Sequence, residues 1–235
     1  MKLRFFNTSW MLGNWMFGSF LFFVLLFSLW PELDIQVSRL FFDPETGRFP
    51  ANDNLVVKFV YWLFKVMPTV IVPLLLGLCG ISLLKKCPRT CRKNRLNYAF
   101  MLIFLLLGPG LIVHTGFKDN WDRARPRNVV EFGGNHQFTP PLVVSDQCDK
   151  NCSFTSGHAA MGFAFIALAW VLQSRLWLVI GLGLGLFVGG VRVIQGGHFL
   201  SDIIFAGYIC YGTAWLLGRW ILKRPELALS KKDTS

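Results

Sequence analysis

Long apolar segments alternate with short polar segments along this chain. Six apolar blocks approach or reach the length that a helix needs to cross a ~30 Å hydrocarbon core. They cover residues 10–30, 66–84, 96–117, 159–173, 176–191 and 202–218. This pattern predicts an all-α, polytopic membrane protein, a bundle of six transmembrane helices that forms a single domain over residues 1–235.

Composition and the remaining apolar segment refine this prediction. Only 16% of the residues are charged, fewer than the roughly one quarter usual in proteins, and this supports a membrane domain. The first block follows Lys2 and Arg4 as a signal peptide would, but it is long and no A-x-A-like cleavage site follows it, so we expect an uncleaved helix. Residues 55–67 carry Lys58 and Lys65, seven positions apart on one helix face. They predict a periplasmic interfacial helix with snorkelling lysines.

Positive charge is concentrated beside the apolar blocks. The chain has 24 lysines and arginines against 13 acidic residues, and six of these cations fall between residues 85 and 95, where no acidic residue occurs. Cationic loops of membrane proteins stay in the cytoplasm. This loop and both termini are therefore predicted to be cytoplasmic, with residues 118–155 outside. The clustering also argues against nucleic-acid binding, which uses basic residues on a soluble surface or arm.

The outer ends of the predicted spans carry an unusual set of polar residues. Lys118, Arg125 and Arg192 could surround a doubly charged phosphate, which arginine binds through paired hydrogen bonds. Ser156 and Gly157 open the fourth span, where backbone N–H groups and the positive end of the helix dipole favour an anion. These five residues are candidate phosphate ligands.

Two histidines and a carboxylate complete the pattern. His198 and Asp202 are four positions apart, which predicts a shared helix face and an aspartate that fixes the histidine tautomer. The other nitrogen of His198 could then attack phosphorus, and His158 could protonate the departing oxygen. Taken singly, each of these residues is more typical of an interfacial anchor, a helix cap or a packing histidine. Their occurrence together favours a catalytic site.

These residues carry a resemblance to a known family. Lys118-x6-Arg125-Pro126, then Thr155-Ser156-Gly157-His158, then Arg192-x5-His198-x3-Asp202 resemble the three signatures of the type 2 phosphatidic acid phosphatase superfamily, in order and with the same spacing. Thr155 and Val191 depart from the proline and serine of the pattern, and neither position takes part in the phosphohistidine step. The resemblance implies a membrane phosphatase domain with its catalytic signatures at 118–202.

The resemblance also implies roles and a cellular place. It implies that His198 is the nucleophile, Asp202 its orienting group, His158 the general acid, and the three cations the phosphate ligands, with no metal and no cofactor. Residues 131–134, 138–140 and 148–154 resemble the loop of bacterial lipid A phosphatases, notably the 4′-phosphatase group. The expected substrate is lipid A, at its 4′- or 1-phosphate, in a bacterial inner membrane with the active site facing the periplasm.

Several alternatives stay open at this point. Undecaprenyl pyrophosphate, phosphatidylglycerol phosphate or phosphatidic acid could be the substrate. A phosphotransferase would use the same residues, and a non-catalytic lipid-headgroup-binding or transport protein would use the cations alone. The expected partners are the substrate lipid and the bilayer, with no obligatory protein partner.

The cysteines and glycines have simpler interpretations. Cys148 and Cys152 lie in the polar outer loop, where a disulfide is plausible, whereas zinc would need a second ligand pair that is missing. Gly181, Gly185 and Gly189 share one helix face and predict close helix packing rather than a nucleotide loop.

Overall fold

The structure is a computed structural model that describes residues 8–118 and 120–224. The cations at positions 2, 4, 231 and 232, on which the predicted cytoplasmic location of the two ends depends, lie outside these residues. All regular secondary structure of the described chain is helical, and this part of the chain contains no β-strand; its only extended pairings are two isolated bridges, Asp43 with Arg48 and Val129 with His136. The predicted all-α fold is confirmed for this part of the chain.

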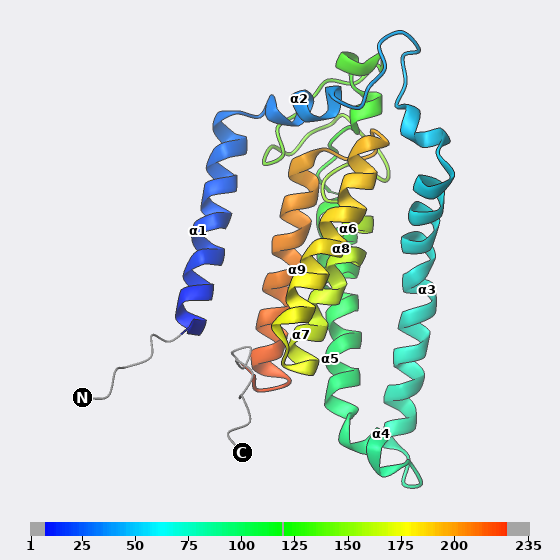
Figure 1. The fold of residues 1–235 in the computed structure, drawn as a ribbon, viewed down its shortest axis with the longest axis vertical. Coiled ribbons are helices and arrows are strands. Elements are labelled where there is room, and N and C mark those ends of the chain that lie inside the picture. Colours follow the sequence, from blue (N-terminus) through cyan, green and yellow to red (C-terminus); the bar gives the residue numbers. More distant parts are fainter. Residues whose placement is uncertain (1–7, 119, 225–235) are drawn as a thin grey trace, which may run out of the picture.

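The helices form an elongated bundle (Figure 1). They are α1 (Thr8–Leu29), α2 (Leu33–Arg39), α3 (Leu55–Leu83), α4 (Arg89–Lys93), α5 (Arg95–Leu105), α6 (Gly157–Phe163), α7 (Ala167–Leu172), α8 (Arg175–Ile194) and α9 (Leu200–Trp220). A π-helical segment, Leu106–Lys118, continues α5, and a 3-10 turn, Ala164–Ile166, joins α6 to α7. Short 3-10 turns also occur at Pro50–Asp53, Pro126–Asn128 and Val130–Phe132.

Four helices of the described chain are long and apolar enough to cross a membrane: Leu55–Leu83, Arg95–Lys118, Arg175–Ile194 and Leu200–Trp220. A fifth span results if Trp15–Leu29 and Leu33–Arg39, which are bent by 84°, count as one broken span. The predicted fourth span is the shorter apolar helix Gly157–Leu172. By length and composition the described chain therefore has four helices, or five with the bent pair, that can span a membrane, and six spans stay a prediction.

Helix α3 differs from its prediction. Residues 55–67 do not form a separate interfacial helix, because α3 runs without a break from Leu55 to Leu83 and contains both Pro68 and Pro73. Its 29 residues are about 44 Å long at 1.5 Å per residue, more than a ~30 Å hydrocarbon core requires. The Asn54 side chain caps its first turn by accepting hydrogen bonds from two backbone N–H groups. The first turns of α3 lie at the end of the bundle that also holds α2 and the long loop (Figure 1).

The centre of the bundle depends on glycine. A Cβ atom on Gly181 would lie 2.3 Å from the backbone nitrogen of Ile166, and one on Gly185 would lie 2.0 Å from the Phe163 ring. Helix α8 can therefore approach α6 and the following turn only because these positions have no side chain. The close packing predicted for this glycine face is confirmed.

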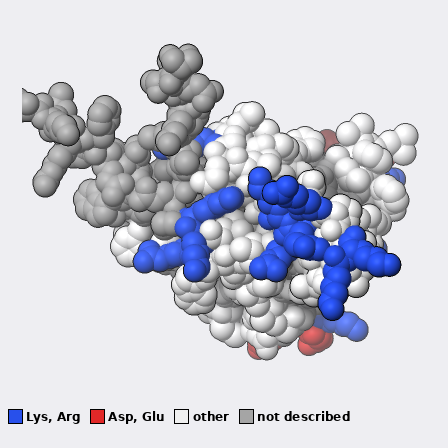
Figure 2. All heavy atoms as spheres, turned by 90° about the horizontal axis from the view of Figure 1, so that it is seen from below, with Lys and Arg blue, Asp and Glu red and all other residues white. Residues whose placement is uncertain are grey.

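The two ends of the bundle differ in charge. Helix α2 and the long loop that precedes α6 lie at one end, and α4 lies at the other (Figure 1). Viewed from the α4 end, lysine and arginine side chains cover much of the visible surface (Figure 2). This end includes the exposed side chains of Lys85, Lys86, Arg89, Arg92, Lys93 and Arg95. The candidate site lies toward the opposite end.

Candidate active site

A cavity of about 700 Å³ opens between α3, the π-helical segment, α6 and α8. Five of the predicted site residues line it: Lys118, Arg125, Gly157, His158 and Arg192. The other three, Ser156, His198 and Asp202, do not line the cavity and are completely buried. The structure thus brings the predicted phosphate-binding cations together around one space and places the predicted nucleophile in the protein interior.

His198 is held through one ring nitrogen. Its Nδ1 lies 2.8 Å from the backbone oxygen of Ser153, and because a carbonyl oxygen can only accept, Nδ1 carries the proton. In the neutral ring this leaves a lone pair on Nε2, which has no hydrogen-bond partner among the described residues. A buried imidazole with one anchored and one unpartnered nitrogen is prepared to act as a nucleophile.

The surroundings of His198 keep it neutral. Burial lowers the pKa of His198 well below its ordinary value of 6.5, and the charges of Arg125, Arg192 and Lys118 lower this pKa further. Since protonation would block attack by the ring, the cations that suit a phosphate also preserve the nucleophilic form of the histidine.

Asp202 supports His198 differently from the prediction. The two residues do not share a helix face: His198 lies in the turn before α9, Phe199 is the N-cap, and Asp202 is in the first helical turn. Asp202 Oδ2 accepts from the backbone N–H of Phe199 at 2.8 Å and from the hydroxyl of Ser153, and lies 3.4 Å from His198 Nδ1. The carboxylate therefore fixes the turn and Ser153, whose carbonyl is the closer partner of the ring.

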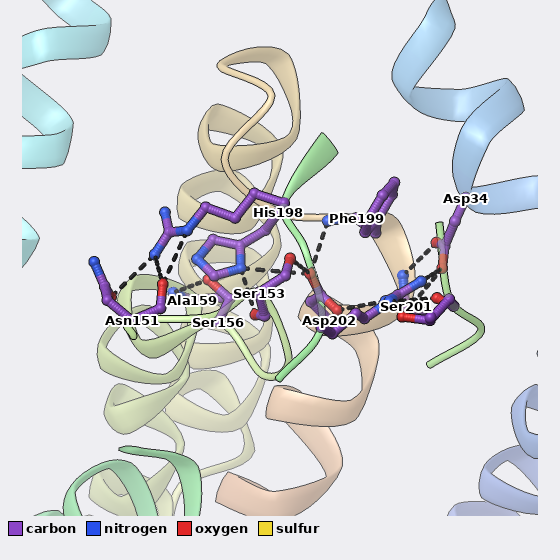
Figure 3. Close-up of polar contacts among 12 residues, drawn as sticks. Asp34, Asn151, Ser153, Ser156, Ala159, His198, Phe199, Ser201 and Asp202 are labelled. Atoms are coloured by element: carbon purple, nitrogen blue, oxygen red, sulfur yellow. Dashed lines mark hydrogen bonds and ion pairs between the residues drawn. The ribbon is translucent and has the colours of Figure 1, made fainter. Parts of the chain in front are cut away.

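A buried arginine, Arg123, connects Asp202 to Asp34, two residues that Figure 3 labels. Arg123 donates to Asp202 Oδ1 at 2.6 Å and to Asp34 Oδ2 at 2.8 Å, and all three side chains are fully buried. It also donates to the Thr139 carbonyl at 2.8 Å, and its guanidinium lies 4.3 Å from the centre of the Phe199 ring. One cation thus joins α2, the long loop and the start of α9.

Sequence reasoning missed both Arg123 and Asp34. Arg123 stands between Lys118 and Arg125 inside the first signature, but the spacing does not show which arginine of this run faces inward. Asp34 is 89 residues from Arg123 and lies in a polar segment far from the signatures. The one available signal was an aspartate that follows an apolar block, and this is too common to assign a role.

Arg125 is positioned by the disulfide-closed loop. Its guanidinium donates to the Asn151 carbonyl at 2.7 and 3.1 Å and to the Asn151 side-chain oxygen at 3.0 Å. Asn151 adopts a left-handed backbone conformation, with φ of 56°, between Cys148 and Cys152, which form a disulfide with Cα atoms 5.7 Å apart. Burial lowers the pKa of Arg125 to about 10, so the guanidinium remains charged at neutral pH.

Further site residues come from α3, α6 and α8, and Lys118 is the last residue of the π-helical segment. The His158 ring stacks on Tyr61 with centroids 4.5 Å apart, and the Arg192 guanidinium lies 4.7 Å from the centre of the same tyrosine ring. Ser156 caps α6, with its hydroxyl accepting from the Ala159 N–H at 3.3 Å. Lys65, predicted to snorkel at the membrane surface, instead lines the cavity, because it lies one turn after Tyr61 on the same face of α3. No group of three or more metal-binding side chains occurs among the described residues.

Comparison with known proteins shows the family of this chain. Residues 96–226 match the PAP2 superfamily and contain all three signatures. The chain belongs to this superfamily. A lipid A 4′-phosphatase of Francisella tularensis subsp. novicida (strain U112) is 34% identical over 210 residues, which cover 86% of this chain and 92% of that protein. A lipid A 4′-phosphatase of Rhizobium leguminosarum is 30% identical over 195 residues, covering 76% and 83%. No solved structure gives a significant match.

The part of the chain that matches the PAP2 superfamily does not include every residue of the site. Helices α1 to α3 precede residue 96, so Asp34, Tyr61 and Lys65 come from outside the matched region. These three residues add a carboxylate, an aromatic ring and a cation to the signature residues.

Proposed function

We propose that this chain hydrolyses a phosphate monoester of lipid A, at the 4′-phosphate, by way of a phosphohistidine. One observation supports phosphatase activity most directly. His198 is neutral and anchored, its Nε2 has no hydrogen-bond partner among the described residues, and it lies behind a cavity lined by cations. Similarity to lipid A 4′-phosphatases over most of the chain supports lipid A as the substrate.

The proposed reaction has two steps. In the first, His198 Nε2 forms a bond to phosphorus, the bond from phosphorus to the sugar oxygen breaks, and His158 gives its proton to that oxygen. In the second, a water oxygen forms a bond to phosphorus, the bond from phosphorus to His198 Nε2 breaks, His158 takes a proton from the water, and inorganic phosphate leaves. Lys118, Arg125 and Arg192, with the backbone at Ser156 and Gly157, stabilise the charge on the phosphoryl oxygens without a metal.

We further propose that the protein crosses a bacterial inner membrane six times, with α1 and Gly157–Leu172 as the two spans beyond the four longest helices. The basic end would be cytoplasmic and the cavity would open toward the periplasm. The cysteines support this orientation: the Cys148–Cys152 disulfide lies in the loop near the cavity, whereas the free thiols of Cys87 and Cys91 lie at the basic end.

Thiol labelling tests this orientation. Asn135 is exposed in the long loop, unlike Gly134, where a Cβ would lie 2.0 Å from the Asn128 carbonyl oxygen. In intact spheroplasts an impermeant maleimide should label Asn135→Cys, and should label the wild type only after lysis. Labelling of Asn135→Cys that also requires lysis would place the cavity on the cytoplasmic side.

The cavity has more positive charge than one phosphate needs. Lys65 and Arg127 line it together with the three signature cations, and no aspartate or glutamate of the described chain does. Neither Lys65 nor the Arg127 side chain has a hydrogen bond or ion pair with another described residue. A single phosphate brings at most two negative charges to five cations, so the cavity suits a headgroup with a second anionic group, such as lipid A with both phosphates.

A comparison of two lipids tests whether lipid A is the substrate and whether the extra cations of the cavity bind its second phosphate. The wild type should release phosphate from lipid A with both phosphates at a higher kcat/KM than from lipid A that retains only the 4′-phosphate. Lys65→Gln should reduce this ratio about fivefold, the effect of losing one partly exposed ion pair. Lys58→Gln, on the same helix but outside the cavity, should leave the ratio unchanged.

The same assay can contradict the proposal. Phosphate release from undecaprenyl pyrophosphate but not from lipid A would remove lipid A as the substrate. If the substrate phosphate is labelled and the label is recovered on a second lipid rather than as free phosphate, the protein is a phosphotransferase.

A further inference from the structure

We propose that Tyr61 of α3 is a positioning residue for catalysis, which holds the general acid His158 and the phosphate ligand Arg192 with one aromatic ring. This inference rests on the roles proposed above for His158 and Arg192. It adds a residue from outside the PAP2 match, supplied by a helix whose sequence pattern indicated only membrane association.

The ring contacts both side chains at distances typical of favourable interactions. The His158 and Tyr61 planes are inclined by 21° with centroids 4.5 Å apart, an arrangement of stacked rings. The guanidinium carbon of Arg192 lies 4.7 Å from the ring centre, within the range of a cation–π interaction. Because His158 comes from α6 and Arg192 from α8, Tyr61 is a common contact for two helices.

Both side chains have few other anchors. His158 Nε2 and Arg192 Nε are buried without a hydrogen-bond partner in the described chain, although Arg192 Nη1 donates to Gln195. A general acid must point at the leaving oxygen, and a misplacement of about 1 Å is enough to slow catalysis strongly. For His158, stacking on Tyr61 restricts the ring while leaving Nε2 available to the substrate.

Tyr61 is itself held by the packing of α3. Val57, Val60 and Phe64, on the adjoining face of the helix, are buried in the main hydrophobic core. The Tyr61 hydroxyl has no hydrogen bond to any described residue, so the contacts to His158 and Arg192 depend on the ring alone. This predicts that phenylalanine can replace tyrosine at position 61, whereas an aliphatic residue of similar size cannot.

The test compares two substrates in a set of variants. An alkyl phosphate such as the lipid needs a proton on its leaving group, whereas p-nitrophenyl phosphate does not. Tyr61→Leu should lower kcat on the lipid about 10- to 100-fold, the range that the loss of two such ring contacts can produce. Its kcat on p-nitrophenyl phosphate should fall much less. Tyr61→Phe should recover most of the lipid activity.

A double variant separates positioning from general damage. If Tyr61 acts through His158, Tyr61→Leu added to His158→Ala should lower the rate on the lipid no more than it lowers the rate on p-nitrophenyl phosphate. Trp62→Leu is the matched control, because it removes an exposed aromatic ring from the neighbouring position of α3. It should leave both rates unchanged.

Four results would overturn the inference. Equal losses on both substrates, additive with His158→Ala, would show that Tyr61 does not act through His158. Loss of lipid activity in Tyr61→Phe equal to that in Tyr61→Leu would assign the role to the hydroxyl. If His158→Ala itself does not distinguish the two substrates, the proposed acid is wrong and this inference fails with it. If His158→Ala distinguishes the two substrates but Tyr61→Leu does not, the proposed role of His158 stands and only this inference about Tyr61 fails.

Discussion

Replacement of His198 by alanine should abolish phosphate release from lipid and aryl substrates alike. The polar groups that line the cavity can still bind and polarise a phosphate, but none of them is proposed to bond to phosphorus. Without His198 no bond to phosphorus can form in the first step, and a better leaving group cannot compensate for a missing nucleophile. Acid-labile, base-stable phosphate trapped on the wild-type protein should therefore be absent from His198→Ala.

His158→Ala should give a different result on the same two substrates. General acid catalysis contributes typically ~10²- to 10⁴-fold, so the lipid should be hydrolysed slowly, while p-nitrophenyl phosphate should recover much of the wild-type rate. Trapped phosphate should persist and can accumulate, because His158 is also proposed to activate the water of the second step. The two histidines are thus distinguished by chemistry as well as by rate.

A third histidine provides the control. His136 lies in the long loop outside the cavity, and His136→Ala should keep wild-type rates on both substrates. If His198→Ala still traps phosphate while His158→Ala does not, the roles of the two histidines are reversed. If neither variant loses activity, the cavity is not the active site.

The apolar pattern predicted where helices occur but not how each one is used. Every predicted block overlaps a helix, because a long apolar segment in a membrane must satisfy its backbone hydrogen bonds internally, as a helix does. The same pattern could not separate the two roles of α3. Lys58 and Lys65 are equivalent in sequence, and only the packing of α3 on α6 and α8 shows that Lys65 faces a cavity.

The signatures likewise predicted which residues meet, but not their contacts. Lys118, Arg125, His158 and Arg192 share one cavity, as their positions at the outer span ends indicated. The four-residue spacing of His198 and Asp202 suggested a helix face, whereas the chain turns between them and Asp202 caps the new helix. Local spacing is ambiguous wherever a helix begins within the motif, and the partners of Asp202 come from loops that no periodicity describes.

Replacement of Arg123 by methionine should both destabilise the protein and slow catalysis. Methionine fills much of the volume of arginine but leaves the carboxylates of Asp34 and Asp202, both fully buried, without their shared cation. Breaking a buried ion pair by removing one partner typically lowers the free energy of unfolding by ~3–5 kcal/mol. Arg127→Met, which removes an exposed arginine from the same segment, should leave the unfolding midpoint unchanged.

The loss of activity should exceed what destabilisation explains. Asp202 holds the Ser153 hydroxyl and the Phe199 N–H, and the Ser153 carbonyl holds His198, so a shifted Asp202 moves the nucleophile. A displacement of about 1 Å can cost ~10²-fold in rate. In Arg123→Met, kcat should fall by about this factor on lipid and aryl phosphates alike, because the nucleophile serves both. KM should change little, since Arg123 does not line the cavity.

Further variants separate the two effects. Arg123→Lys keeps the charge but lacks the fork of donors that reaches Asp34, Asp202 and the Thr139 carbonyl together, so it should be intermediate in stability and rate. Asp34→Asn combined with Arg123→Met removes one of the two unpaired carboxylates and should restore part of the stability. It should restore none of the lost kcat, because Asp202 still lacks its partner.

Stability is measured by thermal unfolding in detergent, and kcat is measured below the unfolding midpoint. If the combined variant regains activity in proportion to stability, or if Arg123→Met keeps its kcat while its midpoint falls, Arg123 stabilises the fold without positioning His198.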